Sequence, residues 1–306
     1  NIYVVHQAKS VGTIDPPANI STAQTFSSTL TANGGAVFNE GSADVDFRVE
    51  SNGNANMLVV NGGEDKVGIG SDPDLGTGLH IKTADSGAGV SVHADELVVE
   101  GSANSGLSIL SGNSSNGRIM FGDDGDNDIG YIEYDHSANQ LALGANAASH
   151  IKIDSAGHVT MPNQSAFLAQ ASGAVTNVAT NNAISTIVLG TEYFDLNGDY
   201  NTSNYTFTAP VTGKYLFSFS ATLNNVDTGA TYISIHIRTS NRNYNEGNAF
   251  GINGYSADET RVEVSQTILA DMDANDTATL GIQQWEGTAQ MDVNDDSAYF
   301  CGHLVA

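Results

Sequence analysis

The chain has 306 residues, enough for two domains, and it contains no apolar run near the roughly 20 residues that a membrane-spanning helix requires. Lys and Arg total 10 against 35 Asp and Glu, a net charge of -25, which excludes nucleic acid and anionic membrane surfaces as partners because such a surface repels phosphate. The single cysteine, Cys301, excludes an intrachain disulfide and a cysteine zinc site, and we expect it to be a small buried apolar residue.

Short strand-like runs fill the region from residue 31 to residue 162. The runs contain alternating or β-branched residues and are separated by Gly, Asn, Asp and Ser, whereas helical periodicity is nearly absent. They are residues 45–49, 57–60, 66–69, 79–81, 96–99, 107–110, 118–121, 131–134, 140–143 and 150–153. The pattern predicts an all-β chain that begins with a β-shaft of short strands.

These strands are too short and too thinly apolar to bury a core within one chain, because each offers few inward side chains against a large ordering cost. Three copies wound about one axis would share a common interior. The sequence therefore predicts a homotrimer. The side chains expected to face the axis are Phe47, Val59, Ile69, Ile81, Val98, Ile109 and Ile119.

After Pro162 the strands lengthen and aromatic residues concentrate, so we place a domain boundary near residue 163. Residues 206–219 predict two strands joined by a Pro/Gly turn, with Tyr215, Phe217 and Phe219 on one face. Further strands are expected at residues 231–238, 261–269, 278–285 and 299–305. This spacing predicts a sandwich of two antiparallel sheets in residues 163–306.

The N-terminal and shaft segments resemble parts of phage fibres. Residues 2–17, which end in Asp15, Pro16 and Pro17, resemble the closing strand of the virion-attaching domain of podovirus-like tail fibres. Residues 38–51 and 66–70 are similar to a shaft module of marine-phage structural proteins. Its companion module is similar to residues 121–123, 128–130, 134–137 and 153–159. The resemblance implies that residues 1–30 are the end of an attachment domain with its linker, that residues 31–162 are the shaft, and that the phage tail is a partner.

The C-terminal region, residues 167–304, resembles the complement-component-q globular head, a relative of the tumour-necrosis-factor jelly roll. The motifs are in residues 166–169, 207–215 and 300–304. The resemblance implies a compact trimeric jelly-roll head. The chain lacks the collagen Gly-X-Y repeat that usually forms the stalk of complement-type proteins, so the stalk here is expected to be β.

One acidic cluster offers oxygen ligands at alternate positions, Asp124, Asp126 and Asp128, in the manner of a calcium loop. Ile129 stands where such a loop has Gly, and Asp135 replaces the bidentate Glu. The cluster is therefore either a calcium site or a solvated hairpin turn, and no other cofactor is expected.

Eight histidines are scattered without metal-ligand spacing, but one His from each of three chains could form a site on a threefold axis. His150 and His158 are the candidates, and the alternative is a solvated or hydrogen-bonded His. No nucleophile elbow, Walker loop or dinucleotide motif is present, so we expect no catalytic residues.

The best binding candidate is the long polar stretch 239–255, in which aromatic rings accompany hydrogen-bonding side chains. The only tryptophan could stack on a sugar ring. The predicted receptor-binding residues are Arg242, Tyr244, Phe250, Tyr255 and Trp285. The alternative is a structural loop and a packed Trp.

The leading functional hypothesis is a non-enzymatic, extracellular tail-fibre subunit of a virion. Its head would contact a glycan or an outer-membrane component of the host surface, with no membrane insertion. The second hypothesis is a secreted bacterial or host filament or adhesin with a complement-type head. The third is a polysaccharide depolymerase.

Overall fold

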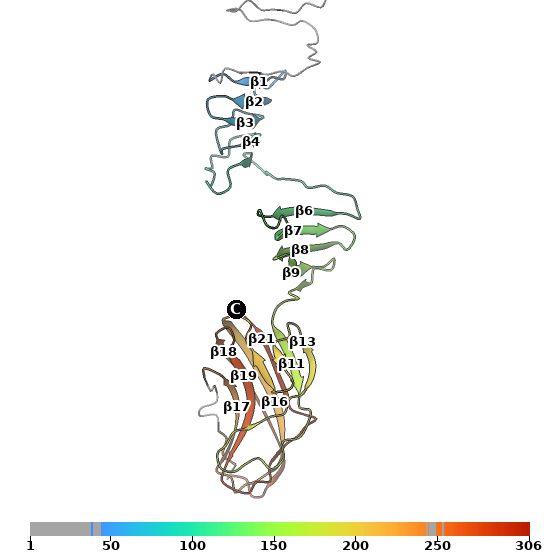
Figure 1. Ribbon diagram of the computed structural model, residues 1–306, viewed down its shortest axis with the longest axis vertical. Coiled ribbons are helices and arrows are strands. Elements are labelled where there is room, and N and C mark those ends of the chain that lie inside the picture. The colour runs from blue at the N-terminus through green and yellow to red at the C-terminus, as the bar shows by residue number, and fades with distance from the viewer. Residues whose placement is uncertain (1–37, 39–43, 243, 245–248, 253) are drawn as a thin grey trace, which may run out of the picture. The chain divides into compact units, whose positions relative to one another are not determined.

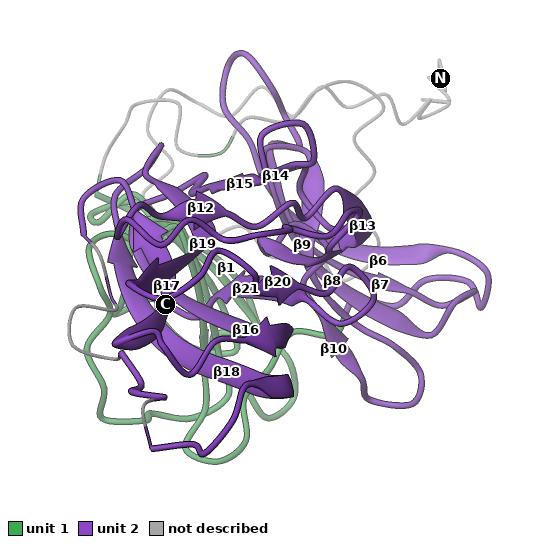
Figure 2. Cartoon of the chain, turned by 90° about the horizontal axis from the view of Figure 1, so that it is seen from below, with its two compact units in different colours: residues 1–108 green, residues 109–306 purple. Residues whose placement is uncertain are grey.

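The computed structural model describes residues 38, 44–242, 244, 249–252 and 254–306. The chain divides into two compact units, Asn1–Ser108 and Ile109–Ala306 (Figure 2). The described regular elements are all strands, which confirms the predicted all-β class (Figure 1). Among the described residues no helix is long and apolar enough to cross a bilayer. The predicted attachment segment, residues 1–30, lies outside the described residues.

The first unit contains one five-stranded sheet. Its strands follow the chain in the order β1 (Phe47–Val49), β2 (Leu58–Asn61), β3 (Lys66–Ile69), β4 (Leu79–Lys82) and β5 (Leu97–Glu100). The first three strands pair antiparallel, and β3, β4 and β5 pair parallel. Parallel neighbours need crossover connections, which are residues 70–78 and 83–96. These connections return over one face of the sheet, where Pro73 packs against Gly68 and Ser86 contacts Glu100.

Strand alternation divides this sheet into two unlike faces, because directly paired residues point to the same side. Val59, His80, Lys82 and Glu100 lie on the covered face and are buried. Every side chain that the strands place on the other face is apolar. These are Phe47, Val49, Leu58, Val60, Val67, Ile69, Leu79, Ile81, Leu97 and Val99.

The predicted axial row was wrong for two residues. Val59 and Val98 lie on the covered face, opposite Phe47, Ile69 and Ile81. Each belongs to a pair of consecutive valines, and only the register of the sheet decides which member of such a pair points to which face.

Residues 107–110 were also predicted to form a strand, and they do not. Leu107 and Leu110 are exposed, and no described strand pairs with this segment. Gly106 and Gly112 flank the segment. A strand-like pattern forms a strand only where it packs against neighbouring strands, and this segment has no such neighbour among the described strands.

The second unit begins with an antiparallel meander. Its strands are β6 (Asn116–Phe121), β7 (Gly130–Asp135), β8 (Gln140–Ala145), β9 (Ala148–Ile153) and β10 (Val159–Thr160). The β8–β9 turn has a positive φ at Asn146 and Ala147. One face again collects the large apolar side chains, with one tyrosine. They are Ile119, Phe121, Ile132, Tyr134, Leu141, Leu143, Ile151, Ile153 and Val159.

A jelly-roll sandwich of two antiparallel sheets forms the rest of the second unit, and the boundary placed near residue 163 lies between β10 and β11. The larger sheet has the order β13 (Thr191–Asp195), β11 (Ala166–Gln170), β21 (Tyr299–Leu304), β16 (Gly213–Val226) and β18 (Glu259–Met272), with β20 (Asp292–Val293) on β16. The smaller sheet has the order β12 (Ser185–Thr186), β19 (Thr277–Trp285), β15 (Thr206–Thr208) and β14 (Tyr200–Asn201), with β17 (Tyr232–Thr239) on β19.

Aromatic rings fill the space between these two sheets. The Phe167 ring stacks on Tyr200 at 4.7 Å and on Phe207 at 5.0 Å between centroids. The predicted inward set of Tyr215, Phe217 and Phe219 is confirmed, since all three are buried. Large buried aromatic rings dominate the energetics of such a core, so the sandwich, unlike the two sheets before it, has an interior within one chain.

Candidate functional site

The uncovered apolar faces of the first sheet and of the meander expose large hydrophobic side chains. Besides Tyr134, ten of their side chains are between about a third and two thirds exposed: Val49, Val60, Ile69, Leu97, Val99, Ile119, Phe121, Ile132, Leu143 and Val159. Contiguous apolar patches of this kind are rare on monomeric soluble proteins and mark contact surfaces. Both faces are therefore candidate subunit interfaces.

The outer face of the larger sandwich sheet is uncharged in its middle. One row across the strands is Leu168, Cys301, Ser218 and Thr267. Ser218 and Thr267 share a hydrogen bond of 2.9 Å between their hydroxyl oxygens. Charged pairs stand only toward the ends of β16 and β18, for example Lys214 with Asp271. A weakly polar surface with charge at its margins suits contact with another subunit.

Cys301 belongs to this outer face. The prediction that it is buried was wrong in part: the residue is half-buried, and its neighbour Phe300 is the one that points into the core. Burial raises the pKa of the Cys301 thiol. The alternation of the last strand, rather than residue type, decides this placement.

Trp285 ends strand β19, where it pairs with Tyr232 of β17. The Trp285 backbone also bridges to Asn181, and the Tyr232 hydroxyl donates a 2.5 Å hydrogen bond to the Asn182 side chain. Trp285 is 37% exposed and lies outside the core cluster. This end of the smaller sheet thus presents an aromatic ring among amide groups, a combination that suits a sugar.

Arg242 and Tyr244 lie at the opposite end of β17. The Tyr244 hydroxyl accepts a 2.9 Å hydrogen bond from the Asp271 amide, and the Arg242 guanidinium lies 5.6 Å from the Tyr244 ring centroid. Strand β17 runs from Tyr232 to Thr239, so the two ends are about 23 Å apart at roughly 3.3 Å per residue. The structure does not bring Trp285 together with Arg242 and Tyr244.

Phe250 and Tyr255 complete the predicted set. The Phe250 backbone exchanges hydrogen bonds with Ile233, and its side chain packs on the sandwich core. Tyr255 is 48% exposed. Residues 243, 245–248 and 253 of the predicted loop lie outside the described residues. Tyr255 and Trp285 are therefore the aromatic members of the set that offer the most free ring surface.

The acidic segment forms the turn between β6 and β7. The Asp123 carboxylate accepts hydrogen bonds from the Gly125 and Asp126 amides, and these lower its pKa. Asp126 accepts from the Asp128 amide, and a side-chain hydrogen bond between the Asp126 and Asp128 carboxyl groups raises the pKa of Asp128. Among the described residues, Asp124, Asp126 and Asp128 do not form a converging group of metal ligands. Calcium binding here stays a prediction.

The two candidate histidines have partners within the chain. The His150 ring contacts the Ala145 carbonyl at 2.8 Å and the Asn163 side chain at 3.1 Å. His158 is exposed, and its Nδ1 lies 2.9 Å from Asp154 Oδ2. These contacts favour the hydrogen-bonded alternative over a free ligand.

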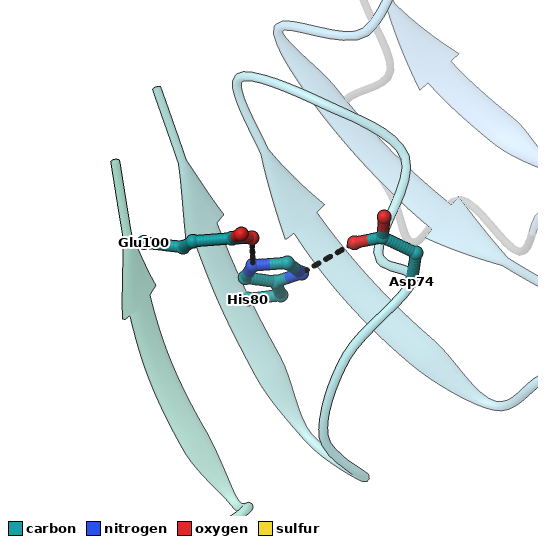
Figure 3. Close-up of side chains that lie close together, drawn as sticks. All are labelled: Asp74, His80 and Glu100. Atoms are coloured by element: carbon teal, nitrogen blue, oxygen red, sulfur yellow. Dashed lines mark hydrogen bonds and ion pairs between the residues drawn. The ribbon is translucent and has the colours of Figure 1, made fainter. Parts of the chain in front are cut away.

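A group that the sequence analysis missed lies on the covered face of the first sheet. Asp74, His80 and Glu100 place one ligand atom each within 4.8 Å of one another (Figure 3). The Lys82 ammonium lies 2.6 Å from Asp74 Oδ2 and 3.4 Å from Glu100 Oε2.

The carboxyl groups of this cluster are held ionised. Hydrogen bonds, first from the Ser86 amide, lower the pKa of Glu100 to about 2. The Lys82 ammonium lowers the pKa of Asp74. Alternation in residues 79–82 could have placed His80 and Lys82 on one face, but nothing in the sequence indicated that the crossover loop returns Asp74 to them.

Residues 166–305 match the family model of the C1q domain. The globular domain of zebrafish complement 1qA protein is 15% identical and aligns over 47% of this chain and 98% of its own, with a TM-score of 0.31. Murine APRIL at pH 8.5 is 8% identical over 46% of this chain and 99% of its own, with a TM-score of 0.32. No curated protein matches the chain. The family match confirms the predicted C1q-like character of residues 166–305.

Proposed function

We propose that the chain is a non-enzymatic, extracellular fibre subunit that assembles as a homotrimer and contacts a host surface through its C-terminal head. The observation that carries the proposal is the pair of uncovered sheet faces in residues 47–99 and 119–159, on which every large side chain except Tyr134 is fully apolar. Copies of the same chain are the occupant that we propose, because a copy carries the same two apolar faces and a closed homo-oligomer can bury each of them against its equivalent.

The free energy available from covering these faces is large compared with the stability of a domain. Full burial of one such side chain contributes about 1.5–3 kcal/mol, so a half-exposed one retains about 0.7–1.5 kcal/mol. Ten of them offer ~7–15 kcal/mol per chain, which equals the ~5–15 kcal/mol of a whole folded domain. A monomer would forgo that stabilisation and keep its sheet edges open to aggregation.

A threefold arrangement is favoured over a twofold one by the head. C1q-like domains typically form homotrimers, and the outer face of the β13-β11-β21-β16-β18 sheet, which is uncharged in its middle, is the surface that we assign to contacts in the head. The three apolar faces of a trimer would then surround one axis along the shaft. This closed arrangement uses the same surface on each copy.

Within this class of fibre we assign the chain to the tail of a tailed phage. The support is the resemblance of residues 2–17 to podovirus-like tail fibres and of two sets of segments to marine-phage shaft modules, namely residues 38–51 and 66–70, and residues 121–123, 128–130, 134–137 and 153–159. Residues 1–30 would attach the fibre to the virion. A secreted adhesin is the second candidate, favoured by the C1q domain match alone, and the neighbouring genes separate the two: tail genes indicate a phage, secretion genes an adhesin.

The host contact is assigned to the Trp285 end of the head, and the ligand class is a surface glycan. Trp285 is 37% exposed, and the segments that pair with its backbone contain Asn181, Asn182 and Tyr232, whose polar groups could bind a sugar beside the ring.

The test uses the full chain, labelled with a fluorophore, on a panel of marine bacteria and a glycan array. We expect saturable binding that Trp285→Ala reduces about tenfold or more and that Arg242→Ala, at the far end of β17, leaves unchanged. Loss of binding in Arg242→Ala alone would move the site to the other end. An absence of binding to every cell and glycan by a trimeric, folded chain would contradict the receptor role.

A further inference from the structure

The structure also carries a site that is independent of assembly and of the head. We propose that His80 and Asp74 bind a divalent transition-metal ion of the zinc class, with the Glu100 carboxylate orienting the His80 ring. All three residues belong to the first unit of one chain, and their side chains point toward one another (Figure 3).

Partners within the chain account for most polar atoms of the cluster. Glu100 Oε1 accepts hydrogen bonds from the Ser86 amide at 2.7 Å and from the Ser86 hydroxyl at 2.8 Å, while Oε2 lies 2.9 Å from His80 Nε2. Asp74 Oδ2 accepts from Lys82 at 2.6 Å. His80 Nδ1 is a buried nitrogen without a hydrogen bond, in a residue that is 1% exposed.

The gap between His80 Nδ1 and Asp74 Oδ1 is compatible with a metal ion that both atoms bind. Asp74 Oδ1 faces this nitrogen at 3.4 Å. An imidazolium donating to a carboxylate would close that distance to about 2.7–2.9 Å. Zinc binds imidazole nitrogen and carboxylate oxygen at about 2.0–2.2 Å, and two ligands 3.4 Å apart then subtend about 110° at the metal, near the tetrahedral angle.

Glu100 prepares the ring for this role. Glu100 Oε2 lies 2.9 Å from His80 Nε2, so in the tautomer that donates this hydrogen to Glu100 the lone pair is on Nδ1, the nitrogen nearer to Asp74. Metal-binding histidines almost always donate their other ring N–H to a carboxylate or carbonyl in this way, and the contact raises the basicity of the ring.

The charge balance favours one more cation. With a neutral His80, the cluster contains two carboxylates and one ammonium, and three of the four side chains are buried. Lys82 contacts the other oxygen of Asp74, so it weakens metal binding by repulsion but does not occupy the gap. The Asp74 side chain is 58% exposed, which gives the ion a path from solvent and room for water ligands.

The experiment measures zinc binding to the untagged full chain by calorimetry and by metal analysis after dialysis at pH 7. We expect one zinc per chain. Asp74→Asn and His80→Gln should lose it, Glu100→Gln should weaken it about 10–100-fold, and Lys82→Met should strengthen it. Asp154→Asn is the matched control, because it removes the carboxylate from an exposed His–Asp pair, His158 with Asp154, that lacks the buried setting.

Two results would overturn the proposal. One is a wild-type chain that takes up no stoichiometric zinc. The other is an Asp74→Asn variant that binds zinc as the wild type does. If His80→Gln does not fold, the exposed Asp74→Asn change still decides the question.

Discussion

Ile119 and Met120 are adjacent in β6 and are both 42% exposed, but they point to opposite faces of the meander. Ile119 lies on the face that we assign to the trimer axis, and Met120 lies on the other. Ile119→Asp therefore places a charge inside the proposed interface, and Met120→Asp places the same charge on the same strand but outside that interface.

The expected effect follows from the exposed fraction of Ile119. Full burial of an Ile side chain contributes about 1.5–3 kcal/mol, so the 42% that is exposed leaves about 0.6–1.3 kcal/mol per chain for assembly to gain. Three chains lose ~2–4 kcal/mol from the apolar contact alone, which is roughly 30- to 700-fold in the assembly constant. Three carboxylates brought near one axis without partners add several kcal/mol more.

The assay is light scattering coupled to gel filtration over a dilution series, with circular dichroism to confirm folding. Ile119→Asp should dissociate or fail to assemble at concentrations where the wild type and Met120→Asp are trimeric. Equal behaviour of the two variants, whether both assemble or both dissociate, would refute the assignment of this face to the interface.

Three further changes test other parts of the structure. Gly302→Ala places a Cβ 2.4 Å from the Phe217 ring, so we expect a loss of about 1–3 kcal/mol in the free energy of unfolding, seen as a lower Tm; an unchanged melt would contradict this packing. If Asp124, Asp126 and Asp128 hold calcium, chelator should lower the Tm of the wild type but not that of Asp126→Asn. Identical melting curves of the wild type with and without chelator would contradict calcium binding and favour a solvated hairpin turn. The Thr228 amide, the Gln290 side chain and the Thr228 hydroxyl lower the pKa of Asp258, so its stabilisation is present above the unfolded value of about 3.9 and is lost as pH falls through the folded value. Asp258→Asn should therefore lower the Tm at pH 6 more than at pH 2.5, and an equal effect at both would count against this linkage.

Sequence patterns located most strands of the molecule because alternation and turn residues are local signals. The runs at residues 131–134 and 140–143, for example, became β7 and β8, and the run at 206–219 became β15 and β16 around its Pro/Gly turn. The register in which the strands pair, in contrast, could not be determined from local sequence patterns. For this reason Val59 and Val98 were assigned to the wrong face, and the parallel pairing of β3, β4 and β5 was not foreseen.

Local sequence patterns were also insufficient to show which residues of the candidate sites lie close together. Trp285, as the only tryptophan, was visible in the sequence, but its separation from Arg242 depends on the antiparallel pairing of β17 with β19. The Asp74, His80 and Glu100 cluster spans 26 positions and depends on two crossover loops whose paths no short motif specifies. Such long-range convergence of polar residues is set by tertiary structure, which local propensity does not determine.

The central claim is that three copies of this chain cover one another's apolar faces, and the native mass in solution tests it most directly. Light scattering of the full chain at neutral pH should give three times the 31.8 kDa of one chain, with a mass that does not fall on dilution to micromolar concentration. A monomer or dimer mass from a folded chain would contradict the trimer and, with it, the proposed fibre.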